Sequence, residues 1–170
     1  MKKYLLSTLA DGICVVLLSV CPILCYASAF SVKLDSSVLI MAAVLFSMVF
    51  SLLSAFVKNN LKYALCMTVI AFVAFLVFVF ANERIFAQAN YAINKLLEQY
   101  SVYLSVYSNI KFASYIANNA TGFFVLLSLI LNGLFSFLIS RIKSIKIAGL
   151  LSIALLVPCF VLVNTLPDLV

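Results

Sequence analysis

The sequence contains no histidine, and only 9% of its 170 residues are charged. Histidine is the commonest general base and metal ligand, and the five cysteines include no C-x-x-C pair. The chain therefore lacks the usual ligands of a zinc or haem site. It also lacks the nucleophile and base pair that a hydrolase needs. We expect no catalytic residue, no cofactor, no metal and no enzymatic activity in this chain alone.

The chain as a whole is strongly apolar. Hydrophobic residues make up 66% of the chain, and its mean hydropathy is +1.26. A soluble domain is about 45–50% apolar and about 25% charged, so this composition requires lipid as the solvent. The net charge is +6, but the basic residues form no clustered face of the kind that binds nucleic acid. The lipid bilayer is the first expected partner, and nucleic acid is not one.

Five apolar stretches are each long enough for a membrane helix, since a hydrocarbon core about 30 Å thick needs roughly 20 residues. They cover about 4–27, 38–57, 63–81, 122–140 and 147–166. The first ends in Ala27-Ser28-Ala29, a pattern typical of a signal-peptidase site, but its length and Asp11 favour a retained helix over a cleaved signal peptide. We expect an all-α membrane protein, a single integral domain over 1–170 built as a polytopic bundle of about five transmembrane helices.

Charge placement predicts the orientation. With five spans, one side of the membrane carries seven basic residues and no acidic one: Lys2, Lys3, Lys58, Lys62, Arg141, Lys143 and Lys146. The other side carries basic and acidic residues in equal number. Because lysine and arginine are retained on the cytoplasmic side, the amino terminus is expected inside and the carboxyl terminus outside. The expected location is the bacterial cytoplasmic membrane.

The segment 82–120 is the one long stretch that is not simply apolar. From Ile85 its apolar residues recur at three and four positions, and Lys95 and Glu98 lie on the opposite face. This pattern predicts an extracytoplasmic amphipathic helix in the membrane interface. Its candidate surface residues form either an aromatic belt or a partner-binding stripe: Tyr91, Leu96, Tyr100, Tyr103 and Tyr107.

Two apolar stretches carry small or polar residues at helical spacing. The second stretch has Ala43, Ser47, Ser51 and Ala55, and the fourth has Ser128, Asn132 and Ser136. Small residues at intervals of four let helix backbones approach closely, so we expect both sets to serve helix packing. A substrate-lined groove or a polar pathway through the bundle is the alternative.

Asp11 is the one ionisable residue inside a predicted span apart from the thiols. An intramembrane carboxylate is costly, so Asp11 is a candidate functional acid. It shares a helical sector with Cys14, Cys21 and Cys25, which leaves redox or metal chemistry as an alternative for that face.

The order of these features resembles the amino-terminal membrane region of bacterial transglutaminase-like membrane proteins. Two segments carry the resemblance. One is the exterior stretch Asn90–Ser101 with Tyr103-Leu104, and the other is the end of the last apolar stretch, from Leu155-Leu156-Val157-Pro158 to Leu166-Pro167. In that family several spans precede an extracytoplasmic Cys-His-Asp domain. No such core is present here, so no catalytic residue is carried over.

The resemblance implies a membrane anchoring and positioning domain for an extracytoplasmic transglutaminase- or protease-like module. It further implies that the chain continues outside the membrane in the full protein, or that a partner subunit supplies the module. Two other functions stay open: a small-molecule transporter membrane subunit that binds substrate and works with a partner motor, and a cell-envelope assembly scaffold.

Overall fold

The computed structural model describes residues 2–57, 59–80, 82–104 and 117–163, and all regular structure within these ranges is α-helical. The helices are α1 (Lys2–Ala29), α2 (Ser36–Phe56), α3 (Asn60–Phe80), α4 (Asn82–Leu104), α5 (Thr121–Ser140) and α6 (Ile145–Val163). The helical class predicted from the sequence is therefore confirmed for the described part of the chain. Each of the five apolar stretches lies largely within a helix, and α4 covers the first part of the predicted exterior segment 82–120. Positions 105–116 of that segment and 164–166 of the last stretch lie outside the described residues.

Among the described residues, three helices are long and apolar enough to cross a membrane: α1 over Ala10–Ala29, α2 and α5. The apolar stretches found in α3 and α6 are shorter, Asn60–Ala74 and Ile145–Cys159. The prediction of five spans is thus met in part. α3 runs partly over residues whose side chains lie outside the description, and α6 is described only as far as Val163.

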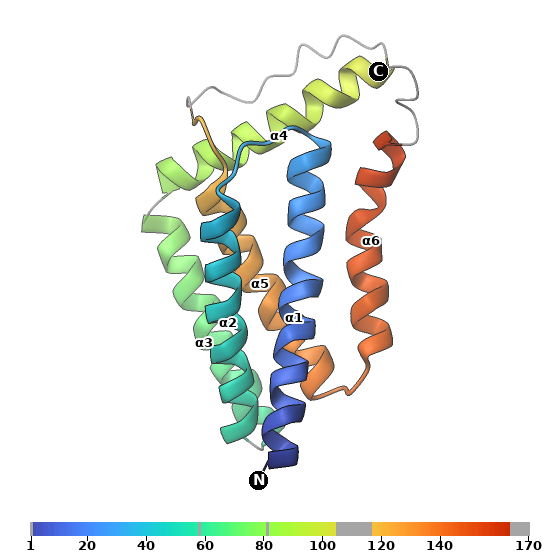
Figure 1. Ribbon diagram of the computed structural model, residues 1–170. Coiled ribbons are helices and arrows are strands. Elements are labelled where there is room, and N and C mark those ends of the chain that lie inside the picture. Colours follow the sequence, from blue (N-terminus) through green and yellow to red (C-terminus); the bar gives the residue numbers. More distant parts are fainter. Residues whose placement is uncertain (1, 58, 81, 105–116, 164–170) are drawn as a thin grey trace.

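The helices α1, α2, α3, α5 and α6 run side by side, and α4 lies across one end of them (Figure 1). The amino terminus lies at the opposite end of the bundle. α5 packs against every other helix, and α1 packs against α2, α5 and α6. The core accordingly lies around α1, α2 and α5, where Val20, Ile23 and Ala43 are buried with Phe124.

Small residues bring α1 and α2 together. Ala43 is fully buried, and the Ser47 hydroxyl donates to the Gly12 carbonyl of α1 at 2.8 Å. A Cβ built on Gly12 would lie 3.3 Å from Ser51 Oγ, so even an alanine there would require the Ser51 hydroxyl to shift. In lipid, where apolar surface alone gives no drive to associate, such close approach supplies the dispersion contacts and hydrogen bonds that hold helices together.

The outward faces of the bundle are apolar. α3 exposes Leu65 (58%), Val69 (60%) and Phe72 (58%), and α2 exposes Met41 and Leu45 to a similar degree. Water-soluble monomers rarely carry apolar surface on this scale, whereas hydrocarbon solvates it without cost. These faces agree with a membrane location.

Candidate functional site

α4 is held onto the bundle by hydrogen bonds at its first half. The Phe123 backbone N–H in the first turn of α5 donates to Gln88 Oε1 at 2.9 Å. The Lys33 backbone N–H in the α1–α2 loop donates to the Tyr91 hydroxyl at 3.4 Å. Because these donors belong to two different parts of the bundle, α4 is fixed in direction as well as in position.

Gly122 is needed for the contact between α4 and α5. A Cβ built there would lie 2.7 Å from Gln88 Oε1, closer than a real Cβ contact allows. Any side chain at this position therefore displaces the Gln88 amide that accepts the Phe123 N–H. The small residue at the start of α5 and the amide on α4 form a matched pair.

The α1–α2 loop and the start of α5 interlock beneath α4. The Asp35 N–H donates to Thr121 Oγ1 at 3.0 Å, and the Ala120 N–H donates to the Lys33 carbonyl at 3.0 Å. Asp35 also caps α2, since its Oδ1 accepts from the backbone N–H groups of Ser37 and Val38. The surface on which α4 rests is thus itself tied down by backbone hydrogen bonds.

An aromatic cluster completes this end of the molecule. The Phe30 side chain is fully buried, with its ring centroid 4.5 Å from that of Tyr26 and 6.0 Å from that of Tyr100 on α4. Tyr26 in turn lies 5.7 Å from Phe124 of α5. Tilted aromatic pairs at such distances add to the stabilisation from burial. Phe30 therefore joins α1, α4 and α5.

The structure places three of the five predicted surface residues against this cluster. Tyr91, Leu96 and Tyr100 are half-buried and pack on the core. Tyr103 belongs to α4 but its side chain lies outside the described part, and Tyr107 lies outside the described residues. Part of the tyrosine face thus contacts the protein's own bundle, whereas the sequence pattern had predicted lipid headgroups or a partner there.

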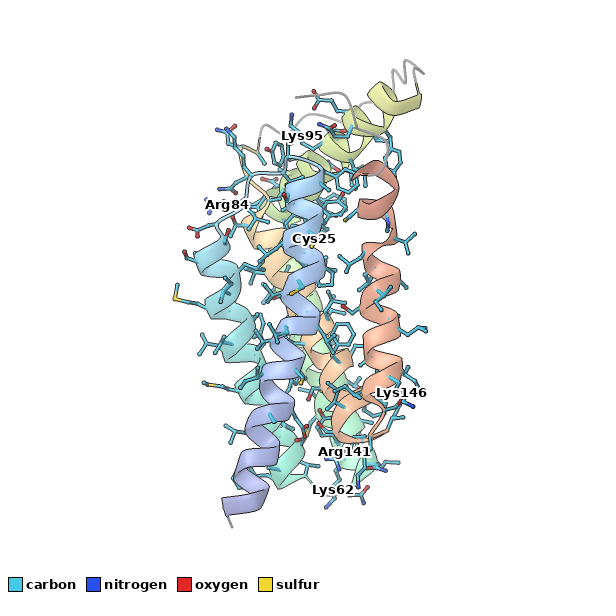
Figure 2. All side chains as sticks on the ribbon, turned by 45° about the vertical axis from the view of Figure 1, so that its right-hand side comes forward. Cys25, Lys62, Arg84, Lys95, Arg141 and Lys146 are labelled. Carbon is cyan, nitrogen blue, oxygen red and sulfur yellow. The ribbon has the colours of Figure 1, made fainter. Side chains whose placement is uncertain are left out.

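The side of α4 away from the bundle is polar. Figure 2 shows Lys95 on that side, and its ammonium lies 2.8 Å from the Glu98 carboxylate. This hydrogen bond is the main cause that raises the pKa of Lys95 above its ordinary value. The Glu98 side chain is 61% exposed, so the pair contributes little to stability and leaves a hydrated surface.

The predicted polar line of α5 is buried inside the bundle. Ser128, Asn132 and Ser136 are each at most 2% exposed. Asn132 Nδ2 donates to the Ser128 carbonyl at 2.8 Å, and the Ser136 hydroxyl lies 3.3 Å from that of Tyr63 on α3. Asn132 Oδ1 is buried and has no hydrogen-bond partner in the described part of the chain. The line lies inside the bundle, away from lipid.

The predicted ridge of α2 lies in the same interior over part of its length. Ala43 and Ser47 are buried and Ser51 is half-buried, whereas Ala55 is exposed and falls outside the contact. Asp11 is half-buried on α1, one residue before the Gly12 carbonyl that accepts from Ser47. Its role as a functional acid stays a prediction.

At the other end of the bundle, Arg141 makes contacts that the sequence did not reveal. Its guanidinium donates to the Val57 carbonyl, to the Ser54 carbonyl at 3.4 Å and to Asn60 Oδ1 at 3.5 Å. It also lies 4.4 Å above the ring of the fully buried Tyr63. Arg141 thereby satisfies carbonyls left open at the end of α2 and ties the α2–α3 turn to α5. Its only sequence signal is its position directly after an apolar stretch.

No three histidine, cysteine, aspartate or glutamate side chains in the described ranges come close enough to hold a metal ion. The described cysteines are free thiols. The arrangement therefore supplies packing surfaces, a polar outer face and an ordered array of hydrogen bonds.

Comparison with protein-family models, with curated proteins and with solved structures gives no match to this chain. The resemblance to transglutaminase-like membrane proteins accordingly rests on the sequence features alone and stays a prediction.

Proposed function

We propose that this chain is a membrane anchoring and positioning domain for an extracytoplasmic transglutaminase- or protease-like module. The observation that carries the proposal is the attachment of α4 across one end of the bundle. Hydrogen bonds from Phe123 and Lys33 and the aromatic contact with Phe30 hold it in place, while Lys95 and Glu98 face away. A rigid helix with a hydrated outer face is suited to support a soluble domain at a fixed height above the membrane.

The proposed topology has five spans, with the amino terminus inside the cell and the carboxyl terminus outside. A helix rises about 1.5 Å per residue, so the 21 residues of α3 and the 19 of α6 extend close to the thickness of the hydrocarbon core. Lys62, Arg141 and Lys146 lie at one end of the bundle, and Arg84 and Lys95 lie at the other (Figure 2). The positive-inside rule then favours α4 on the outer side of a bacterial cytoplasmic membrane.

Transport by this chain is less well supported. That function needs the polar residues of α2 and α5 to line a shared cavity. In the structure α2 and α5 pack extensively against each other. An apolar groove lies between α3 and α5, and neither Ser47 nor Asn132 is among the described residues that line it. A cell-envelope scaffold would also use the outer face of α4, and it differs from the proposed function in having only non-covalent partners.

The proposed function is tested by asking what lies above α4. A photo-crosslinking amino acid at Glu98 in the full-length protein should react with a transglutaminase- or protease-like domain, encoded after Val170 or by a separate subunit. The same group at Lys143 serves as the control from the opposite end and should not reach that domain. A reading frame that stops at Val170, together with Glu98 crosslinks to lipid alone, would overturn the proposal.

A further inference from the structure

An apolar groove of about 460 Å³ lies between α3 and α5 and reaches α4. Its wall includes Met67, Ile70 and Ala74 from α3, Ile130 and Gly133 from α5, and Ile85 from α4. Every described side chain that lines it is apolar, and the groove is not fully enclosed. The lining does not include Ser128, Asn132 or Ser136 of the polar line of α5, but it includes Phe123, whose N–H donates to Gln88.

The groove exists because α3 packs loosely. α3 contacts α4 and α5 at few positions, whereas α1 and α2 contact each other and α5 extensively. At Gly133 the two helices meet through Met67, whose Cε would lie 2.9 Å from a Cβ on that glycine. α3 lacks the regular small residues of α2, so it cannot close onto α5 along its whole length.

The size and chemistry of the groove select a hydrocarbon chain as its occupant. An acyl chain has a much smaller cross-section than a helix, which is about 10–12 Å wide with its side chains. Water would find no polar partners on this lining. A flexible acyl chain from the surrounding bilayer is thin and apolar, and it fits a cavity in the usual size range of ligand sites, about 300–1,000 Å³.

An exposed cation stands next to a residue of the groove in the chain. Ile85 lines the groove, and the residue before it, Arg84, is exposed at the start of α4. The acidic residue of this first turn, Glu83, is favoured there by the helix dipole, whereas a cation is not. A phosphate beside Arg84 would offset that cost through charge-assisted hydrogen bonds.

We propose that the groove between α3 and α5 binds one acyl chain of a glycerophospholipid, with Arg84 contacting the phosphate. The lipid fills space that side chains leave empty and holds α3 against the bundle. This inference does not depend on the anchoring role, because it concerns the contact between α3 and α5 and needs no exterior module.

The proposal is tested by native mass spectrometry of the chain, extracted from vesicles of phosphatidylglycerol and phosphatidylethanolamine with a mild detergent. The wild-type chain should retain one phospholipid. Ala74→Phe, which fills the groove, should reduce the retained fraction at least tenfold, and Ala74→Leu should reduce it less. Ala64→Phe adds the same bulk to an exposed position of α3 and should retain the lipid. Arg84→Gln should weaken retention several-fold.

Circular dichroism of each variant keeps the comparison interpretable, since helix content should be the same in all of them. The proposal fails if the wild-type chain retains no phospholipid, or if Ala74→Phe retains as much as Ala64→Phe. It also fails if the wild-type chain is a lipid-free dimer that Ala74→Phe converts to a monomer, because a second copy would then occupy the groove.

Discussion

The two ends of the bundle are closed in different ways. At the α4 end, a helix with a polar outer face is joined to the bundle by an aromatic cluster around Phe30 and by hydrogen bonds to Gln88 and Tyr91. At the opposite end, the Arg141 side chain, which follows α5, contacts the end of α2 and the start of α3. The first end carries the exposed Glu98 carboxylate on the outer face of α4, and the second uses the Arg141 guanidinium for contacts inside the bundle while Lys62, Lys143 and Lys146 stay exposed. The outer face of α4 is the surface that the proposed function assigns to a partner.

The largest expected effect comes from Phe30→Ala. Phe30 is fully buried between Tyr26 and Tyr100, and truncating a buried phenylalanine costs about 3–5 kcal/mol. We expect the free energy of unfolding, measured by denaturant titration in micelles, to fall by that amount. Phe72→Ala removes a ring that is 58% exposed on α3 and should change it little. Equal losses in both variants would show that Phe30 does not hold α4.

Arg141→Ala should have the next largest effect. It removes charge-assisted hydrogen bonds to two carbonyls of the α2 end together with the contact above Tyr63, worth about 2–3 kcal/mol in all. Arg141→Lys keeps the charge but loses the planar fork, so its stability should be intermediate. Lys143→Ala removes an exposed cation from the same turn and is the control. If Lys143→Ala is as destabilising as Arg141→Ala, charge and not the observed contacts stabilises this end.

A smaller effect is expected from Gly122→Ala. The new Cβ displaces Gln88 Oε1, and the lost hydrogen bond to the Phe123 N–H costs about 1 kcal/mol, partly offset by the better helix propensity of alanine. Hydrogen exchange at the Phe123 amide should accelerate about fivefold. Gly149→Ala meets no atom within 4 Å and should leave that amide unchanged. Unaltered protection in Gly122→Ala would contradict the proposed contact.

The smallest effect concerns Lys95 and Glu98. The hydrogen bond raises the pKa of Lys95 in the folded state, so its stabilisation is present below the ordinary pKa of 10.5 and is lost as the pH rises above it. Because both side chains are exposed to solvent, the change should be close to the error of a denaturant titration. NMR titration of Lys95 should show its pKa falling towards 10.5 in Glu98→Gln. A pKa that does not move would place its cause elsewhere.

The sequence predicted much of the helical layout because apolar length and helical period are local properties. The helix over 82–104, its polar face at Lys95 and Glu98, and the buried residues Ser128, Asn132 and Ser136 were all visible as patterns along one segment. The contacts of Arg141 and the match between Gly122 and Gln88 were not visible. The hydrogen bond of Arg141 to Val57 joins residues 84 positions apart, and that of Phe123 to Gln88, beside Gly122, joins residues 35 positions apart. Their geometry exists only once the helices are arranged.

The tyrosines of α4 show a second feature that the sequence does not reveal, which is what covers an apolar helix face. Their spacing indicates which face of α4 is apolar, but the pattern is the same whether lipid, a partner or the protein's own bundle covers that face. Phe30 lies at the start of the α1–α2 connection, and its ring contacts Tyr100, so the bundle itself covers that tyrosine. The count of membrane spans differs from the predicted five because, within the described residues, α3 and α6 have shorter apolar stretches than α1, α2 and α5.

Cysteine labelling tests the central claim, that α4 lies on the extracytoplasmic surface of a membrane bundle. After the five native cysteines are replaced, Glu98→Cys and Lys143→Cys are each treated with a membrane-impermeant maleimide in intact cells. We predict that Glu98→Cys is labelled directly and Lys143→Cys only after the membrane is permeabilised. Labelling of Lys143→Cys in intact cells, with Glu98→Cys protected, would contradict the account.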